Sequence, residues 1–297
     1  MGLAAIIDEV MRPHGNRQGL SIGWTVVVWL SYILSQSDHR LSYVESWVKE
    51  QLPILQVLLS KPLSERDFTD DRLGDVLHYL SDDTVWQALE AKVGQQLVSV
   101  YELPCEQVHV DSTSVAVYHD ASENALLEFG LSKDHRPDLA QFKVMQSSLG
   151  PFGLPVATLT VSGEQADDVL YLPVIEQSRK VLQRRGVLYS GDSKMEALQI
   201  RATLAAGGDF YLTPLSKKGK QEQLLDELLS AVWSQQQQLT EIRRQAVDSS
   251  EPPLLAQAFE TVRPQSAVPK ENTADWPERS LVSYSPTSAE ASKQALA

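Results

Sequence analysis

Cysteine is nearly absent from this chain, which has 297 residues and a single cysteine, Cys105. One thiol cannot form an internal disulfide, and without neighbouring thiols it cannot build a zinc site, so we expect it to be inert. Long apolar runs are missing too. The longest, Ile22 to Leu34, is shorter than the roughly 18 residues that indicate a membrane span. The N-terminus, with Asp8 and Glu9, lacks the pattern of an export signal. We therefore expect a cytoplasmic protein without a membrane partner.

Positive charge is also in short supply. Lys and Arg number 26 against 39 Asp and Glu, which gives a net charge of −13. This balance argues against a protein that coats nucleic acid, because phosphate binding draws on clustered Lys and Arg. It leaves room for a local basic groove, although each basic cluster could equally be a solvated face. The clusters are Lys133, His135, Arg136 and Lys143; then Arg179, Lys180, Arg184 and Arg185; then Lys217, Lys218 and Lys220.

Helical periodicity dominates residues 1–104, which we interpret as an all-helical N-terminal domain. At 42% hydrophobic residues, the chain has room for about two domains. The helices predicted from apolar spacing and capping residues are Leu3–Met11, Ile22–Leu34, Leu41–Leu59 with an interruption at Pro53, Thr69–Leu80 and Ser81–Leu97. The aromatic residues expected to anchor its core, rather than to stack on bases, are Trp24, Trp29, Trp47 and Trp86.

Residues 105–216 change to strand periodicity and then alternate between helix and strand. The predicted strands are Val108–Tyr118, Ala125–Gly130, Leu154–Val161, Val187–Ser190 and Phe210–Leu215, and the predicted helices are Asp168–Arg185 and Lys194–Ala206. The order is βββαβαβ, which indicates an α/β fold with a mixed sheet. An antiparallel meander comes first, and strands joined by helices then lie parallel to one another.

The signal weakens in residues 217–297. We predict a helix over Gln221–Gln237, with the glutamine run Gln235–Gln238 on its surface, and a polar, proline-bearing stretch from Ser249 to Asp275. A strand at Ser280–Ser285 and a helix that starts at Thr287 complete the prediction.

Two aspartates on or just beyond predicted strands are candidate metal ligands. Asp111 lies in the strand Val108–Tyr118, and Asp192 follows Val187–Ser190, so the two could meet on neighbouring central strands. Carboxylate oxygens hold Mg²⁺, and a pair of such ions can activate an entering oxygen and stabilise a leaving one during attack on phosphate. Two aspartates at strand ends are also compatible with a purely structural role, and a metal site of this kind needs a third acidic ligand.

Several basic side chains are candidates for contact with a phosphate group. We favour such contact for Lys133, His135 or Arg136, while the alternative is a surface turn, because Pro137 biases the preceding residue away from helix. Lys194, just past Asp192 at a predicted helix start, either approaches the substrate of that site or is a solvated lysine of the first turn. His109 shares a strand face with Asp111, and we interpret it as a packed, hydrogen-bonded histidine rather than a ligand.

Taken together, several sequence blocks resemble a bacterial insertion-sequence DDE transposase. These blocks are His109–Ser114, Gly130–Lys143, Gly153–Pro155, Ala166–Pro173, Gly191–Met195 and Trp276–Ser285. They occur in the family's order and cover most of the chain. The whole set of blocks, rather than any one block, is specific to the family.

The resemblance implies a ribonuclease-H-like core, preceded by a helical domain and followed by part of a β-rich insertion. Asp111 and Asp192 would be the first and second acidic ligands for Mg²⁺ or Mn²⁺. The implied partners are double-stranded DNA, as transposon ends and target, and a second copy or a full-length transposase. The implied reaction is DNA cleavage and strand transfer without a covalent enzyme intermediate, so that the protein contributes positioning and charge neutralisation.

One departure from the family concerns the third carboxylate. In the family it follows the insertion, on a helix with a tyrosine, an arginine and then the glutamate, and this chain ends before such a helix. Glu278 matches a position inside the insertion and does not fill the place. We therefore expect a truncated, catalytically defective transposase. The alternatives are a structure-selective nuclease of the same fold and a noncatalytic DNA- or protein-binding fragment.

Overall fold

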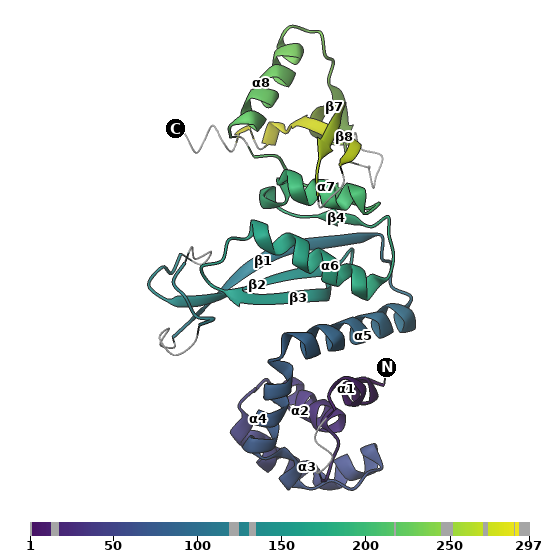
Figure 1. Cartoon of the computed structure of the whole chain (residues 1–297), viewed down its shortest axis with the longest axis vertical. Helices are drawn as coiled ribbons and strands as arrows, with labels where there is room; N and C mark the ends of the chain where they lie inside the picture. Colours follow the sequence, from purple (N-terminus) through teal and green to yellow (C-terminus); the bar gives the residue numbers. More distant parts are fainter. Residues whose placement is uncertain are drawn as a thin grey trace. The chain divides into compact units, whose positions relative to one another are not determined.

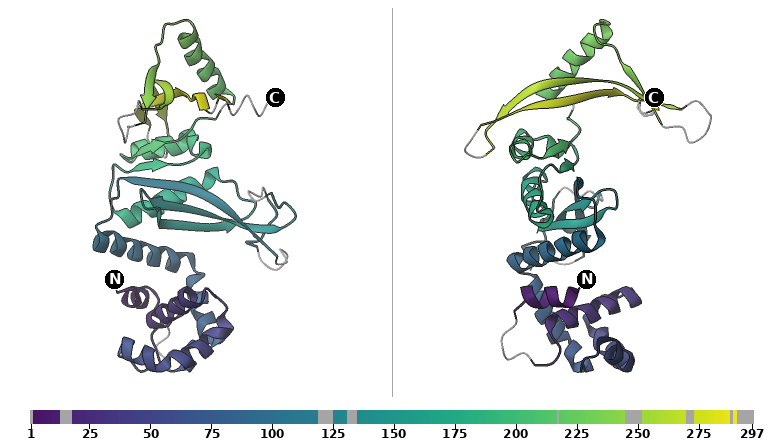
Figure 2. Two further views of the ribbon diagram at one scale, coloured as in Figure 1. Left: turned by 180° about the vertical axis from the view of Figure 1, so that it is seen from behind. Right: turned by 90° about the vertical axis from the view of Figure 1, so that its right-hand side faces the viewer.

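The computed structural model describes residues 2–12, 18–118, 125–130, 135–216, 218–244, 252–269, 273–287 and 289–290. The chain divides into two compact units, Met1–Val187 and Leu188–Ala297, and each is considered by itself. Figure 1 and Figure 2 show the helices and strands of each unit. Among the described residues, no helix is both long enough and apolar enough to cross a membrane.

The first unit begins with helices close to the predicted ones. They are α1 (Leu3–Val10), α2 (Ile22–Gln36), α3 (Val44–Leu59), α4 (Asp70–Leu80) and α5 (Asp83–Tyr101), with the 3₁₀ turns η1 (Leu41–Tyr43) and η2 (Glu65–Phe68). Pro53 lies inside α3 without ending it, so the predicted interruption is wrong. The N-cap of α5 is Asp82 rather than Ser81, because its carboxylate accepts hydrogen bonds from the backbone N–H groups of Thr84 and Val85.

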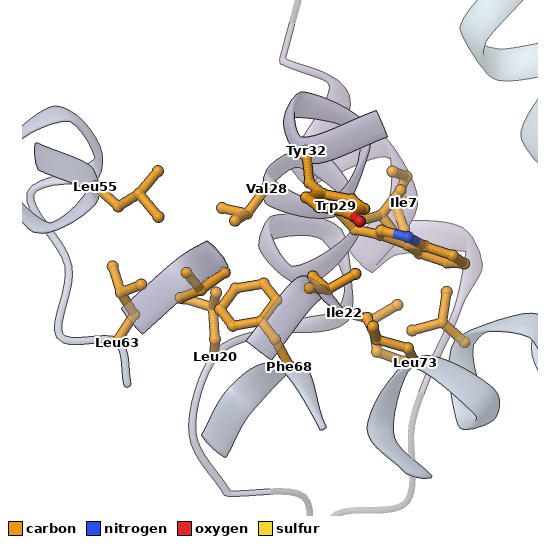
Figure 3. Close-up of a cluster of buried hydrophobic side chains, with 14 of the residues drawn as sticks. Ile7, Leu20, Ile22, Val28, Trp29, Tyr32, Leu55, Leu63, Phe68 and Leu73 are labelled. Atoms are coloured by element: carbon orange, nitrogen blue, oxygen red, sulfur yellow. The ribbon is translucent and has the colours of Figure 1, made fainter. Parts of the chain in front are cut away.

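A hydrophobic core joins these helices (Figure 3). Phe68 and Leu73 have no exposed surface, and Trp29 is 8% exposed. Trp24 and Trp47 are partly buried against the same core, so three of the four tryptophans act as predicted. The prediction is wrong for Trp86, which is 39% exposed and donates a hydrogen bond from Nε1 to Thr158 Oγ1 at 3.1 Å.

An antiparallel sheet follows in the same unit, with one helix packed on it. Its strands are β1 (Gln107–Val117), β2 (Ala140–Leu149) and β3 (Leu154–Ser162), and the helix is α6 (Tyr171–Leu182), preceded by η4 (Asp168–Leu170). β2 pairs with both β1 and β3. Ser147 of β2 and Ser178 of α6 share a buried hydrogen bond of 2.7 Å, which places α6 on the Ser147 face of the sheet.

The second strand of this sheet differs from the predicted one. Ala125–Gly130 is not a strand, and its contribution is an isolated bridge between Glu128 and Gln141. β2 lies further along the chain. Its inward face carries the polar residues Gln141, Lys143 and Ser147, all buried, which hides the apolar alternation that marks most strands.

The second unit opens with two short parallel strands joined by helical segments. β4 (Leu188–Ser190) pairs with β5 (Phe210–Leu212) in parallel register. The connection consists of η5 (Ser193–Glu196) and α7 (Leu198–Ala206). The predicted helix Lys194–Ala206 is therefore broken at Ala197, whose ψ of 128° is not helical.

The rest of this unit contains more strand than predicted. After α8 (Lys220–Trp233) come β6 (Thr240–Arg243), β7 (Leu254–Ala267) and β8 (Ala274–Tyr284), which form an antiparallel sheet. The stretch Ser249–Asp275 thus contains a long strand that its polar composition concealed. The glutamine run is not helix surface, because α8 ends at Trp233 and Gln235 has a left-handed φ of 59°. The described chain is a mixed α/β protein with antiparallel and parallel strand pairs.

Candidate functional site

Asp111 lies in the middle of β1, on the solvent-facing side of the strand. β1 alternates strictly, so Val110 and Ser112 are buried while Asp111 between them is exposed. Asp111 Oδ1 accepts a hydrogen bond of 2.8 Å from the backbone N–H of Ser112. Its partner across the ladder is Gln146 of β2, which is half-buried. The carboxylate therefore lies on an accessible face of the sheet. A ligand of a metal ion, whether the ion is free or bound to DNA, needs such a position.

His109 stands two residues before Asp111 on the same strand face. Its side chain is exposed, so the prediction of a packed histidine is wrong, whereas the shared face is confirmed.

Asp192 lies two residues beyond β4 and caps η5. Its Oδ1 accepts a hydrogen bond of 2.8 Å from the backbone N–H of Lys194, and its backbone carbonyl accepts one of 2.7 Å from Thr213 Oγ1. The side chain is exposed. Because the residue is fixed through both its carboxylate and its carbonyl, its position is determined by the turn between β4 and η5 and by the segment after β5.

The two aspartates belong to different units, Asp111 to the first and Asp192 to the second. Their carboxylate oxygens are the hard ligands that Mg²⁺ and Mn²⁺ prefer, so the donor chemistry fits such an ion. Within the part of the chain that the structure describes, no three His, Cys, Asp or Glu side chains gather into a metal site.

The basic candidates of residues 130–143 differ in their environments. Lys133 lies outside the described residues. His135 is exposed, with a φ of 57°, and belongs to an irregular segment, in agreement with a surface turn. Arg136 donates through Nε and NH2 to the two carboxylate oxygens of Asp138, at 2.9 and 2.7 Å, and its guanidinium lies over the ring of Tyr118. This hydrogen-bonded pair lowers the pKa of Asp138. A phosphate at Arg136 would have to compete with that carboxylate.

Lys143 is not part of an accessible basic surface. Its side chain is 7% exposed, and Nζ donates to the carbonyl of Gln165 at 2.6 Å and to Asp167 Oδ1 at 3.2 Å. A buried ammonium needs such partners, because desolvation disfavours an unpaired charge. Lys143 therefore anchors the segment between β3 and α6. Lys194, by contrast, is exposed beside Asp192.

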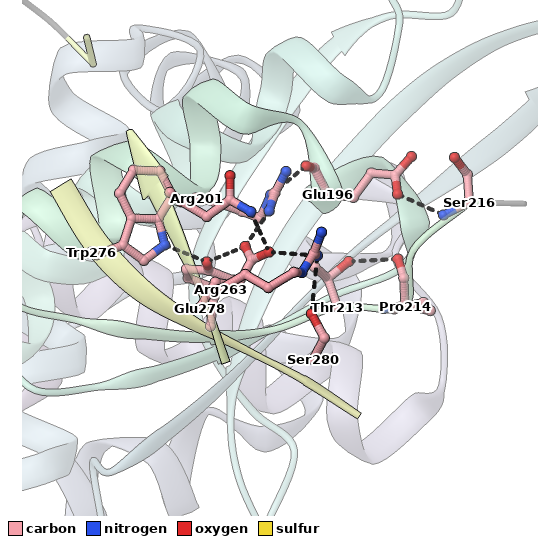
Figure 4. A network of polar contacts seen from close by, with 11 residues as sticks. Glu196, Arg201, Thr213, Pro214, Ser216, Arg263, Trp276, Glu278 and Ser280 are labelled. Carbon is pink, nitrogen blue, oxygen red and sulfur yellow. Dashed lines mark hydrogen bonds and ion pairs between the residues drawn. The ribbon is translucent and has the colours of Figure 1, made fainter. Parts of the chain in front are cut away.

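A buried polar network in the second unit centres on Glu278 of β8 (Figure 4). Glu278 forms an ion pair with Arg201 of α7, and each side chain is 6% exposed. Tyr211 donates its hydroxyl to Glu278 Oε2 at 2.6 Å, and Trp276 Nε1 donates to the Tyr211 oxygen at 2.7 Å. Burial, together with the hydrogen bond to Glu278, raises the pKa of Tyr211 to about 12, so that its hydroxyl stays a donor at neutral pH.

The network explains why Glu278 is unsuited to bind a metal, since its oxygens already face cations and donors. The sequence places Glu278 in the insertion and gives no sign of its partner. Arg201 was missed altogether, although a charged residue between the apolar Ile200 and Ala202 in a predicted helix is a signal for a buried ion pair.

The second unit also contains an apolar groove with a volume of about 710 Å³. α8 lines one wall through its leucines and Trp233. The paired strands β7 and β8, which we call the β7–β8 ribbon, line another wall through Phe259, Val282 and Tyr284. Its apolar walls do not suit a phosphate backbone, which is bound by cations and backbone N–H groups.

No protein-family model matches the sequence, and no curated protein matches it. Among solved structures, the chain is similar to a piggyBac transposase in a synaptic complex with hairpin DNA, with 8% identity and a TM-score of 0.38 over 95% of this chain. It spans 57% of that protein's length. The Mos1 strand transfer complex matches with 12% identity and a TM-score of 0.26, over 76% of this chain and 67% of that one. The Mos1 mariner paired end complex with Mn matches with 13% identity and a TM-score of 0.25, over 75% of each chain. TM-scores this low do not define a common fold, so a functional assignment has to rest on the residues of this chain.

Proposed function

We propose that this chain is the core of a DDE-type DNA transposase of a bacterial insertion sequence, with Asp111 and Asp192 as ligands of Mg²⁺ or Mn²⁺. The observation that carries the proposal is the placement of the two aspartates within the βββαβαβ order. Asp111 is exposed in the middle of the first strand, and Asp192 is exposed at the turn after the fourth. The resemblance of the sequence blocks to the family supports these roles for the same two residues.

For this function the two aspartates, one in each unit, must meet at one site. A divalent ion held there would supply activation of the oxygen that enters at phosphorus and charge neutralisation for the oxygen that leaves. The chain's own contribution is to hold the two carboxylates: Asp111 through the Ser112 N–H, and Asp192 through the Lys194 N–H and Thr213. The exposed Lys194 and His135 are the proposed phosphate contacts, together with Lys133, which lies outside the described residues.

The proposed site also needs a third acidic ligand, supplied by this chain, by another copy or by a full-length transposase. Glu278 does not serve, because it is buried in its ion pair with Arg201. We infer that the chain on its own binds DNA ends and metal but performs little strand transfer.

The test is metal-dependent cleavage of supercoiled plasmid and of duplexes that carry insertion-sequence ends. We expect Mn²⁺-dependent nicking to be slow in the wild type and lost in Asp111→Ala and in Asp192→Ala. Each substitution should also weaken Mn²⁺ binding, measured by calorimetry, on the order of tenfold or more, because each removes a ligand. Asp226→Ala is the matched control, since it removes an exposed carboxylate of α8 that is distant in sequence from both aspartates.

Two other outcomes would favour the alternative functions. Nicking without joining of ends, with the same dependence on both aspartates, would favour a structure-selective nuclease. DNA binding that is unchanged in the double variant Asp111→Ala/Asp192→Ala, together with no cleavage in the wild type, would favour a noncatalytic binding fragment and count against the proposed transposase.

A further inference from the structure

The buried pair Arg201–Glu278 connects the β-ribbon of the second unit to the turn that carries Asp192. Glu278 is fixed from the ribbon side by Gln265 Nε2, which donates to Oε1 at 3.2 Å, and by Arg263, whose NH2 lies 3.6 Å from the same oxygen. From the other side it accepts from Tyr211 of β5 and from Arg201 of α7. A buried carboxylate with four donor side chains from three elements has little freedom to move.

Arg201 has a second partner, which extends the connection toward Asp192. Its Nε donates to the backbone carbonyl of Glu196 at 2.7 Å, while NH1 pairs with Glu278. Because the guanidinium is planar and rigid, these two bonds fix Glu196 relative to Glu278. Figure 4 shows both bonds on the same side chain.

Glu196 ends the short helix η5 that Asp192 caps, and it is tied at a second point. Its Oε2 accepts a hydrogen bond of 2.6 Å from the backbone N–H of Ser216, beyond β5. On the same segment, Thr213 Oγ1 binds the carbonyl of Asp192 at 2.7 Å. The Asp192 turn is thereby held at both ends of η5, by the segment after β5 and by Arg201.

We propose that Arg201 and Glu278 are positioning residues for Asp192. Through these two residues, the position of the β7–β8 ribbon determines the geometry of the turn between β4 and η5, which carries Asp192. This role rests on the proposed function, in which Asp192 is a metal ligand. A partner or DNA that shifts the ribbon would then shift Asp192 through Glu278, Arg201 and Glu196.

The coupling is tested by hydrogen exchange of the full chain without metal or DNA. The amide of Lys194, bound to Asp192 Oδ1, and the amide of Ser216, bound to Glu196, report on the turn. In Glu278→Gln we expect both to exchange on the order of tenfold faster, because a charged, buried hydrogen bond is lost. Glu260→Gln is the matched control. It removes an exposed ion pair with Arg279 between the same two strands, and both amides should keep their wild-type rates.

A second pair of variants separates positioning from simple stability. Arg201→Lys keeps the positive charge but replaces two fixed nitrogens with a single flexible one, which does not hold Glu196 and Glu278 at a set spacing, so the two amides should still exchange faster. Arg201→Met/Glu278→Leu replaces the pair with apolar side chains, which preserves folding in many buried pairs. We expect it to fold with normal circular dichroism and yet to lose protection at Lys194 and Ser216.

Unchanged exchange at both amides in all three variants would overturn the inference. So would a uniform acceleration across α7, β5 and β7, which would mean that the pair only stabilises the unit. Mn²⁺ binding to the wild type is measured in parallel. If Mn²⁺ does not bind while the two amides respond as expected, the coupling stands and it is the proposed metal function that fails.

Discussion

At the residue scale, Glu90 is a carboxyl whose environment opposes its charge. Burial between α5 and its neighbours raises the pKa of Glu90, although a hydrogen bond of 2.7 Å from Thr158 lowers it in part. Its Oε2 and the Oε1 of Gln177 are both buried and lack a donor among the described residues. The pKa of Glu90 is higher in the folded state than in the unfolded state, so protonated Glu90 favours folding relative to ionised Glu90. This contribution to stability is present below the unfolded-state pKa and is lost as the pH rises through the folded-state pKa.

We therefore expect Glu90→Gln to stabilise the protein at pH 7, by up to about 1 kcal/mol, a modest figure because solvent screens a half-buried carboxyl. The gain should shrink toward pH 4, where the carboxyl is protonated in both states. Urea unfolding at both pH values measures it. Glu50→Gln, at an exposed position of α3, is the control and should show no such gain. A destabilised Glu90→Gln at pH 7 would contradict the assignment.

At the scale of elements, the N-terminal helices depend on one shared core rather than on their individual propensities. Leu73 of α4 has no exposed surface, whereas Leu58 of α3 is 73% exposed. We expect Leu73→Ala to lower the free energy of unfolding by about 2–5 kcal/mol, through lost burial and the cavity left behind. Leu58→Ala should stay within about 0.5 kcal/mol of the wild type. Chemical denaturation followed by circular dichroism measures both, and equal effects would show that α4 does not pack as described.

At the scale of the whole molecule, the net charge of −13 governs encounters with DNA. Lys143 and Arg201 are buried in ion pairs and Arg136 is bound to Asp138, so these three cations contribute little to the displacement of counterions. We expect random duplex DNA to bind with a Kd of about 10⁻⁴ M or weaker near 0.15 M salt, with a shallow salt dependence. Fluorescence anisotropy at several salt concentrations measures both quantities. Micromolar binding with a steep salt slope would contradict this prediction and indicate a basic surface.

Local periodicity was sufficient to predict much of the fold. Helices through the first 104 residues, the strand around Asp111, α6 and the βα order up to β5 all follow from apolar spacing, which depends only on neighbours in sequence. Of the strands that the sequence did not predict, β2 and β7 carry polar side chains where strands are usually apolar. Periodicity cannot reveal a polar residue that is buried with a partner.

The candidate site likewise has features that the sequence predicted and features that it did not. The sequence by itself placed Asp111 on a strand and Asp192 just after one, because alternation and turn signals are local, and the structure added that Asp111 lies on the exposed face. Only the tertiary structure decided that Lys143 is buried against Asp167 and that Glu278 pairs with Arg201, 77 positions away. The physical reason is that burying a charge is unfavourable unless a partner is present, and that partner is brought in by the fold from a distant segment.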